Sequence, residues 1–158
     1  MRDEDRYREY VVARAAALRR TGYLICGDWH RAEDAVQQVL VALYAKPPRS
    51  WDTVDAWVRT ALVRRLVDES RRPWRREHST DLPPDSHAPD DHADDRLTLL
   101  EALRTLPAMQ RAVVVLRYWD DLSVPDTAAA LRISEGTVKS HASRGLAALR
   151  THLERTHP

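Results

Sequence analysis

The sequence predicts an all-α protein made of two small helical domains joined by a flexible acidic linker. Apolar residues recur at spacings of three and four in both halves, the period of amphipathic helices, and no long stretch alternates at period two. Between the halves, residues 77–95 contain seven acidic residues, three prolines and no lysine or arginine. Such a segment buries too little apolar surface to order itself. The predicted boundaries are therefore 1–76, 77–95 and 96–158.

Three helices are predicted in the first domain. The second of them has the strongest amphipathic pattern, beginning after a candidate N-cap at Asp28 and ending before Pro47. The third runs from Val54 to Arg72 and stops at Pro73, because proline breaks a helix interior. A weaker apolar stripe predicts the first helix, on Tyr7, Val11, Ala15 and Leu18. Together they predict a three-helix bundle.

Four helices are predicted in the second domain, over residues 97–105, 107–118, 123–131 and 134–153. The third begins with a capping-box variant at Ser123, and Ser134 caps the fourth. A short helix, a tight turn at 132–134 and a longer helix have the spacing of a helix-turn-helix, whose second helix enters the DNA major groove.

The last helix has two contrasting faces when wound at 100° per residue. The predicted core stripe consists of Val138, Ala142, Leu146, Leu149 and Leu153. The opposite arc consists of Gly136, Lys139, Ser140, Ser143, Arg144 and Ala147. This arc holds cations, short hydroxyls and small residues but no acid, which favours contact with DNA over an ordinary solvated face.

The third helix of the first domain presents a different combination of side chains. Trp57, Thr60, Arg64, Val67 and Arg71 share one side, and Arg72, Trp74, Arg75 and Arg76 follow. Aromatic and arginine side chains together can stack on unpaired bases and hold phosphates, so single-stranded nucleic acid fits this side. The alternative is that Trp57 belongs to the core and the arginines are merely solvated; composition leaves both open.

The distribution of charge also points to nucleic acid. The three segments carry net charges of +5, −7 and +3, which sum to the +1 of the whole chain. Two basic domains on an acidic tether suit a polyanionic partner, although an acidic segment can also serve solubility alone.

Four segments, in this order and spacing, resemble the extracytoplasmic-function (ECF) sigma factors, most closely their actinobacterial SigE-like branch. They are Ala32-Glu33-Asp34-Ala35-Val36-Gln37-Gln38-Val39-Leu40, Asp55-Ala56-Trp57-Val58-Arg59 leading to residues 67–72, residues 106–118 beginning Leu106-Pro107, and Ser134-Glu135-Gly136-Thr137-Val138-Lys139-Ser140. Two positions depart from the usual pattern. Gln38 stands where glutamate is common, and His141 stands where a basic residue is usual.

The resemblance implies a promoter-specificity subunit of bacterial RNA polymerase, with sigma domain 2 at 1–76 and sigma domain 4 at 96–158. Polymerase core is then a partner through its β′ clamp helices and β flap, and promoter DNA is the other; whether an anti-sigma factor also binds is left open. The implied core contacts are Asp34, Gln37 and Gln38. The implied −10 contacts are Trp57, Thr60, Arg64, Arg71 and Arg72. The implied −35 contacts are Gly136, Thr137, Lys139, Ser140, Ser143 and Arg144.

The main rival interpretation is a stand-alone regulator that uses the helix-turn-helix, with residues 1–76 as a dimerisation or sensing bundle. The charged side of the third helix argues against it, because a dimer interface would be poorer in charge. An enzyme is not expected: the adjacent acids Glu33-Asp34 and Asp120-Asp121 point about 100° apart on a helix, so surface solvation or helix ends explain them.

Metal, membrane and disulfide chemistry are not expected either. No two of the seven histidines form a His-x3-His pair, and Cys26 is the only cysteine, so neither a metal site nor an internal disulfide is predicted, and no cofactor is expected. No apolar run approaches the roughly 18 residues of a membrane span. The charged segment Arg2-Asp3-Glu4-Asp5 does not suit a signal peptide, so we expect a cytoplasmic protein.

Overall fold

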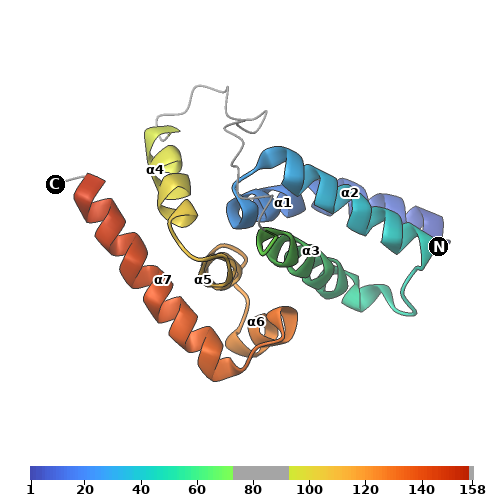
Figure 1. Ribbon diagram of the computed structural model, residues 1–158. Helices are drawn as coiled ribbons and strands as arrows, with labels where there is room; N and C mark the ends of the chain where they lie inside the picture. Colours follow the sequence, from blue (N-terminus) through green and yellow to red (C-terminus); the bar gives the residue numbers. More distant parts are fainter. Residues whose placement is uncertain (73–92, 157–158) are drawn as a thin grey trace.

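The computed structural model describes residues 1–72 and 93–156, which form helices and no strands (Figure 1). The helices are α1 (Asp3–Cys26), α2 (Trp29–Ala45), α3 (Val54–Ser70), α4 (Ala93–Arg104), α5 (Ala108–Val114), α6 (Val124–Leu131) and α7 (Glu135–Thr156), with a 3-10 turn η1 (Trp51–Thr53) and a π-helical turn η4 (Val115–Trp119). The all-α prediction is confirmed. Most of the predicted linker, residues 77–92, lies outside the described residues.

The helices α1 to α3 form the N-terminal bundle, residues 3–72. Gly27 ends α1 with φ 73°, a left-handed conformation that glycine adopts without strain. The side chain of Asp28 then accepts a hydrogen bond from the Arg31 backbone N–H, which confirms the predicted N-cap of α2. The chain therefore reverses within two residues, and the apolar stripe of α2 packs against α1 and α3. Leu62 and Leu66 of α3 lie fully buried at the centre of this bundle.

The helices α4 to α7 form the C-terminal bundle, residues 93–156. Helix α4 begins at Ala93, four residues before the predicted start and inside the segment predicted as linker. The predicted single helix over 107–118 is α-helical only to Val114, and the π-helical turn η4 follows it. The Asp120 backbone N–H closes this turn by donating to the Val115 carbonyl oxygen at 3.0 Å. Asp120 is thereby placed at the end of the turn, facing α1.

Helix α7 packs against α5 through a glycine rather than through the predicted leucine. The buried stripe contains Val138, Ala142, Gly145 and Leu149, whereas Leu146 is 37% exposed, so its prediction as a core residue was wrong. A Cβ atom added at Gly145 would lie 2.6 Å from Cγ2 of Val114. The two helices approach too closely at this point for any larger side chain.

The N-cap of α6 provides a test of the local stability of the helix-turn-helix. The Ser123 hydroxyl accepts a hydrogen bond from the Asp126 backbone N–H at 3.1 Å, as the capping-box pattern predicts. We expect Ser123→Ala to lower the free energy of unfolding by about 1 kcal/mol, because one backbone donor of the first turn loses its partner. Thermal melts followed by circular dichroism measure the loss. The control Ser143→Ala, on the exposed face of α7, should stay within about 0.5 kcal/mol of the parent chain.

Candidate nucleic-acid interface

The predicted recognition face of α7 is open to solvent. Gly136, Lys139, Ser140, Ser143 and Arg144 are exposed, and Thr137 is half-buried. The Thr137 backbone N–H donates to Oγ of Ser134 at 3.1 Å, which confirms the predicted cap. The helix therefore presents its cations, hydroxyls and small residues together along one face, and its N-terminal end is fixed by a cap.

The predicted nucleic-acid side of α3 is only partly exposed. Trp57 is 46% exposed, so the alternative in which it belongs to the core is wrong. Arg71 and Arg72 are exposed and Thr60 is half-buried. Val67, which shares this side by spacing, is buried among the core residues instead. Helix α3 ends at Ser70, two residues before the predicted end, so the structure leaves an aromatic ring exposed on the helix and two arginines exposed just after it.

The guanidinium of Arg64 on α3 contacts the C-terminal bundle. Its Nε donates to the carbonyl oxygen of Ala130 and its Nη2 to that of Ala129, both at 2.9 Å. These carbonyls lie in the last turn of α6, where helical carbonyls have no partner within the helix. Helix α3 accordingly lies against α6 (Figure 1).

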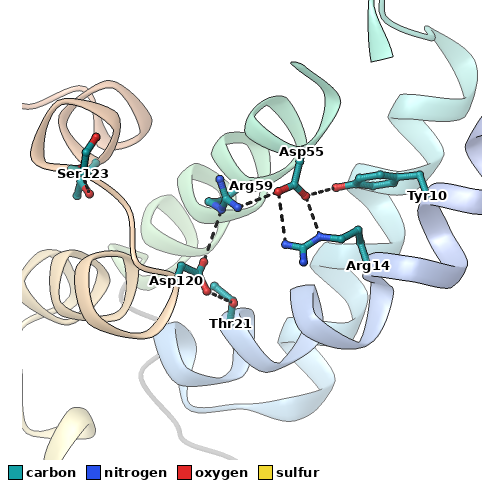
Figure 2. Close-up of polar contacts among 8 residues, drawn as sticks. Tyr10, Arg14, Thr21, Asp55, Arg59, Asp120 and Ser123 are labelled. Atoms are coloured by element: carbon teal, nitrogen blue, oxygen red, sulfur yellow. Dashed lines mark hydrogen bonds and ion pairs between the residues drawn. The ribbon is translucent and has the colours of Figure 1, made fainter. Parts of the chain in front are cut away.

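A polar network connects the two bundles beside this contact (Figure 2). Within the N-terminal bundle, Asp55 accepts hydrogen bonds from the Tyr10 hydroxyl at 3.0 Å, Arg14 Nε at 3.0 Å and Arg59 Nη2 at 2.8 Å. Across to the C-terminal bundle, Arg59 Nε lies 3.6 Å from Oδ2 of Asp120. The spacing of Asp55 and Arg59, four residues apart on one helix, is the only part of this network that a sequence pattern indicates.

Asp120 is the member of the network that the C-terminal bundle supplies. Its Oδ1 accepts a hydrogen bond from the Thr21 hydroxyl at 2.8 Å, and its side chain is only 14% exposed. Asp120 lies at a helix end, as one of the sequence-based explanations expected. Its carboxylate is paired with Thr21 and Arg59, however, and is not a solvated surface group. Burial raises the pKa of this carboxyl, while the Thr21 hydroxyl and the Arg59 guanidinium act in the opposite direction. The hydrogen bond from Thr21 and the attraction to Arg59 therefore offset only part of the free-energy cost of removing the carboxylate from water.

Guanidinium groups also lie buried where α4 and α5 meet the end of α1. Nη2 of Arg104 donates to the Gly27 carbonyl oxygen at 2.8 Å. Arg111 is 6% exposed, and its Nε and Nη1 have no hydrogen-bond partner among the described residues. Burial lowers the pKa of Arg111, and the like charges of Arg31 and Arg104 add to that effect. We call these contacts, with those of Arg64 and Asp120, the seam between the bundles.

Cys26 lies at this seam. Its Sγ donates to the Asp28 carbonyl oxygen at 3.1 Å, and burial raises the pKa of the thiol to about 11. The thiol is therefore protonated at neutral pH and unreactive, as expected of a buried cysteine.

The predicted core-contact residues lie together on the exposed side of α2. Asp34, Gln37 and Gln38 are all exposed, and Nε2 of Gln38 donates to Oδ2 of Asp34 at 3.5 Å. A shallow depression lined by His30, Arg31, Glu33, Asp34 and Gln37 lies beside them.

An apolar groove between α4 and α7 was not predicted. It is lined by Leu99, Leu146, Leu149 and Leu153, with Asp95, Thr98, Arg150 and Glu154 around them.

Within residues 1–72 and 93–156, no three histidine, cysteine, aspartate or glutamate side chains come together as metal ligands would. None of the helices described there combines the length and apolar character of a membrane span.

Comparison with known proteins identifies the family. Residues 96–149 match the model of sigma-70, region 4. The chain is 38% identical to the RNA polymerase sigma-E factor of Streptomyces avermitilis, over 94% of this chain and 85% of that protein. It is 36% identical to the ECF RNA polymerase sigma factor SigL of Mycobacterium tuberculosis, over 89% of this chain and 84% of that protein.

A solved structure is similar over nearly the whole length. The sigma factor RpoE of Bartonella quintana, in complex with the anti-sigma factor NepR, superposes with a TM-score of 0.76 at 25% identity, covering 94% of this chain and 96% of that one. The similarity therefore extends through both bundles and is not confined to the helix-turn-helix. With the relatives from Streptomyces and Mycobacterium, it shows that the chain belongs to the ECF sigma factors of RNA polymerase.

Proposed function

We propose that this sigma factor divides promoter recognition between its two bundles, with residues 1–76 as sigma domain 2 and residues 96–158 as sigma domain 4. Helix α7 recognises the −35 element, α3 opens and holds the −10 element, and α2 docks on the polymerase core. The observation that carries this proposal is the exposed, acid-free face of α7 at the end of a helix-turn-helix. Such a face suits a major groove, where phosphates and base edges both attract cationic side chains.

The −10 assignment is supported by the exposed Trp57 of α3 and by the exposed Arg71 and Arg72 that directly follow this helix. Base stacking on an aromatic ring requires separated strands, and the exposed indole offers such a ring. We therefore assign strand separation to α3 rather than to α7.

The polymerase contacts are assigned to two surfaces. The exposed polar side of α2 around Asp34 is the candidate contact for the β′ clamp helices. The apolar groove between α4 and α7 suits an amphipathic helix, and we assign it to the β flap. The solved relative from Bartonella quintana is bound to an anti-sigma factor, and we propose a partner of that class for this chain as well.

The α2 assignment predicts the effect of reversing one charge. We expect Asp34→Arg to weaken binding to core polymerase at least tenfold, because an exposed acid at the centre of the surface becomes a cation. Titration of labelled chain with core polymerase measures the affinity, and circular dichroism checks that the helices are retained. The control Asp68→Arg makes the same reversal at an exposed acid of α3. Equal affinities for the two variants would remove this side of α2 from the docking surface.

The overall proposal is tested by transcription in vitro with purified core polymerase. We expect specific start sites to appear only when this chain is added. A stand-alone regulator would instead bind duplex DNA in the absence of polymerase and would create no new start site with core alone. That result would contradict the division of labour between α3 and α7.

A further inference from the structure

Buried arginine side chains gather around the turn between α1 and α2. Arg31 belongs to the N-terminal bundle, and Arg104 and Arg111 belong to the C-terminal bundle. We propose that these three guanidiniums form a binding site for one small oxyanion of the phosphate class. None of the three arginines belongs to the proposed DNA or polymerase contacts, so this site goes beyond the function proposed above.

This arginine cluster holds most of the unpartnered polar atoms in the described part of the chain. Among residues 1–72 and 93–156, seven buried side-chain nitrogen and oxygen atoms lack a hydrogen-bond partner. Five of them are guanidinium nitrogens of the cluster: Nε and Nη2 of Arg31, Nε of Arg104, and Nε and Nη1 of Arg111. A sixth, the Tyr23 hydroxyl, lies near Arg104. Buried donors without a partner are costly, above all on charged groups, so their concentration at one place indicates a site for an acceptor from solution.

The charges at this turn do not balance. Arg111 is 6% exposed, and the charges of Arg31 and Arg104 that act on it are both positive. Glu69 lies 3.6 Å from Nη2 of Arg31, and the buried Asp28 belongs to the turn itself. Three guanidiniums against these two carboxylates leave one positive charge at this point of the described fold. A buried charge is stable only when it is paired, so an anion from solution offsets the excess.

The acceptors closest to the cluster along the chain already accept hydrogen bonds. The Gly27 carbonyl oxygen accepts from Nη2 of Arg104, and the Asp28 carbonyl oxygen accepts from Sγ of Cys26. The Cys26 thiol supplies no negative charge at neutral pH, because burial raises its pKa to about 11. The turn therefore offers donors in excess of acceptors.

A small oxyanion suits these donors better than a monatomic ion. The planar fork of a guanidinium donates to two oxygens of a phosphate at once. Because the three guanidiniums come from α2, α4 and α5, an ion with four oxygens can accept from more than one of them. The side chain of Arg31 is 14% exposed and lines the shallow depression beside α2, which gives a small ion a route from solvent. The buried position of Arg111 suits a free ion rather than the phosphate of a nucleic acid.

Thermal melts of the full chain at constant ionic strength test this site. We expect about 10 mM inorganic phosphate to raise the melting temperature by about 3 °C or more over sodium chloride, because an ion that binds only the folded chain stabilises it. Arg111→Met keeps a long side chain but removes the guanidinium, and it should reduce this shift to less than about 1 °C. The matched control Arg155→Met removes an exposed guanidinium in the last turn of α7 and should keep the full shift.

Two further variants and a titration decide between the outcomes. Arg104→Met removes a second guanidinium of the cluster and takes the place of Arg111→Met if that variant does not melt cooperatively. Arg144→Met removes a cation of the proposed −35 face, and loss of the shift in this variant alone would place the ion on the DNA face and overturn the site. Calorimetric titration of the parent chain with phosphate should give one ion per chain. Equal melting temperatures in phosphate and chloride, or a shift retained in both cluster variants, would also overturn the proposal.

Discussion

Arg144→Ala is expected to weaken binding to the cognate −35 duplex by about 5- to 150-fold, a loss of about 1–3 kcal/mol, and to relax specificity at a single base pair. Arg144 is exposed on the outer face of α7, and its planar fork matches the two acceptors of a guanine edge. Lys139 lies five residues earlier and about 140° around the helix, where a point charge suits a phosphate. Lys139→Ala should therefore weaken binding to all DNA sequences almost equally. It should also lower the slope of log affinity against log salt concentration, the salt slope, by about one.

Binding isotherms on the cognate duplex and on single-base variants, each at two salt concentrations, separate these two effects. Lys139 is nearer the N-terminal end of α7, where helix-turn-helix proteins also contact bases, so an exchange of the two roles would be visible in the same data. Arg155 is exposed in the last turn of α7, outside the predicted −35 face, and Arg155→Ala provides a control that loses the same charge. If neither Lys139→Ala nor Arg144→Ala changes the affinity or the salt slope, α7 is not the DNA-recognition helix.

Trp57→Ala is expected to slow promoter opening by about 5- to 150-fold while closed-complex binding is nearly unchanged. The ring is 46% exposed, and each base stacked on an aromatic side chain contributes about 1–3 kcal/mol that becomes available only once the strands part. Permanganate footprinting measures opening, and band-shift titration measures the closed complex. A single substitution is preferable to a double change with Arg64, because Arg64 also holds the seam.

The variant Trp57→Phe is the matched control for this experiment, since it keeps an aromatic face at the same position. It should retain most of the opening rate. A large fall in thermal stability of Trp57→Ala, or equal loss in closed and open complexes, would show that the ring supports the fold instead of the bases.

The helices and their caps could be predicted from the sequence because both are local properties. Asp28, Ser123 and Ser134 cap helices as their spacing predicts, and the face of α7 carries the expected side chains. The packing of α7 on α5 was missed because Gly145 carries no apolar signal. Its small size is what brings the two helices together.

The seam could not be predicted, for a different physical reason. Arg64 bonds backbone carbonyls, which every residue possesses, so no residue type marks its partners in the sequence. Thr21 and Asp120 are 99 residues apart, and the π-helical turn that orients Asp120 has no local signature. Distant pairs of this kind depend on how whole bundles meet, which hydrophobic periodicity does not specify.

The order of residues in the Arg64 contact has a consequence during synthesis. Ala130 follows Arg64 by 66 positions, whereas the core of the N-terminal bundle is complete within the first 72 residues. At about 5–20 residues per second, a ribosome needs about 3–13 s to make the intervening chain. For that interval every nascent copy has its N-terminal bundle without the α6 carbonyls that engage Arg64, so the guanidinium of a newly made chain stays in water until residue 130 has been made.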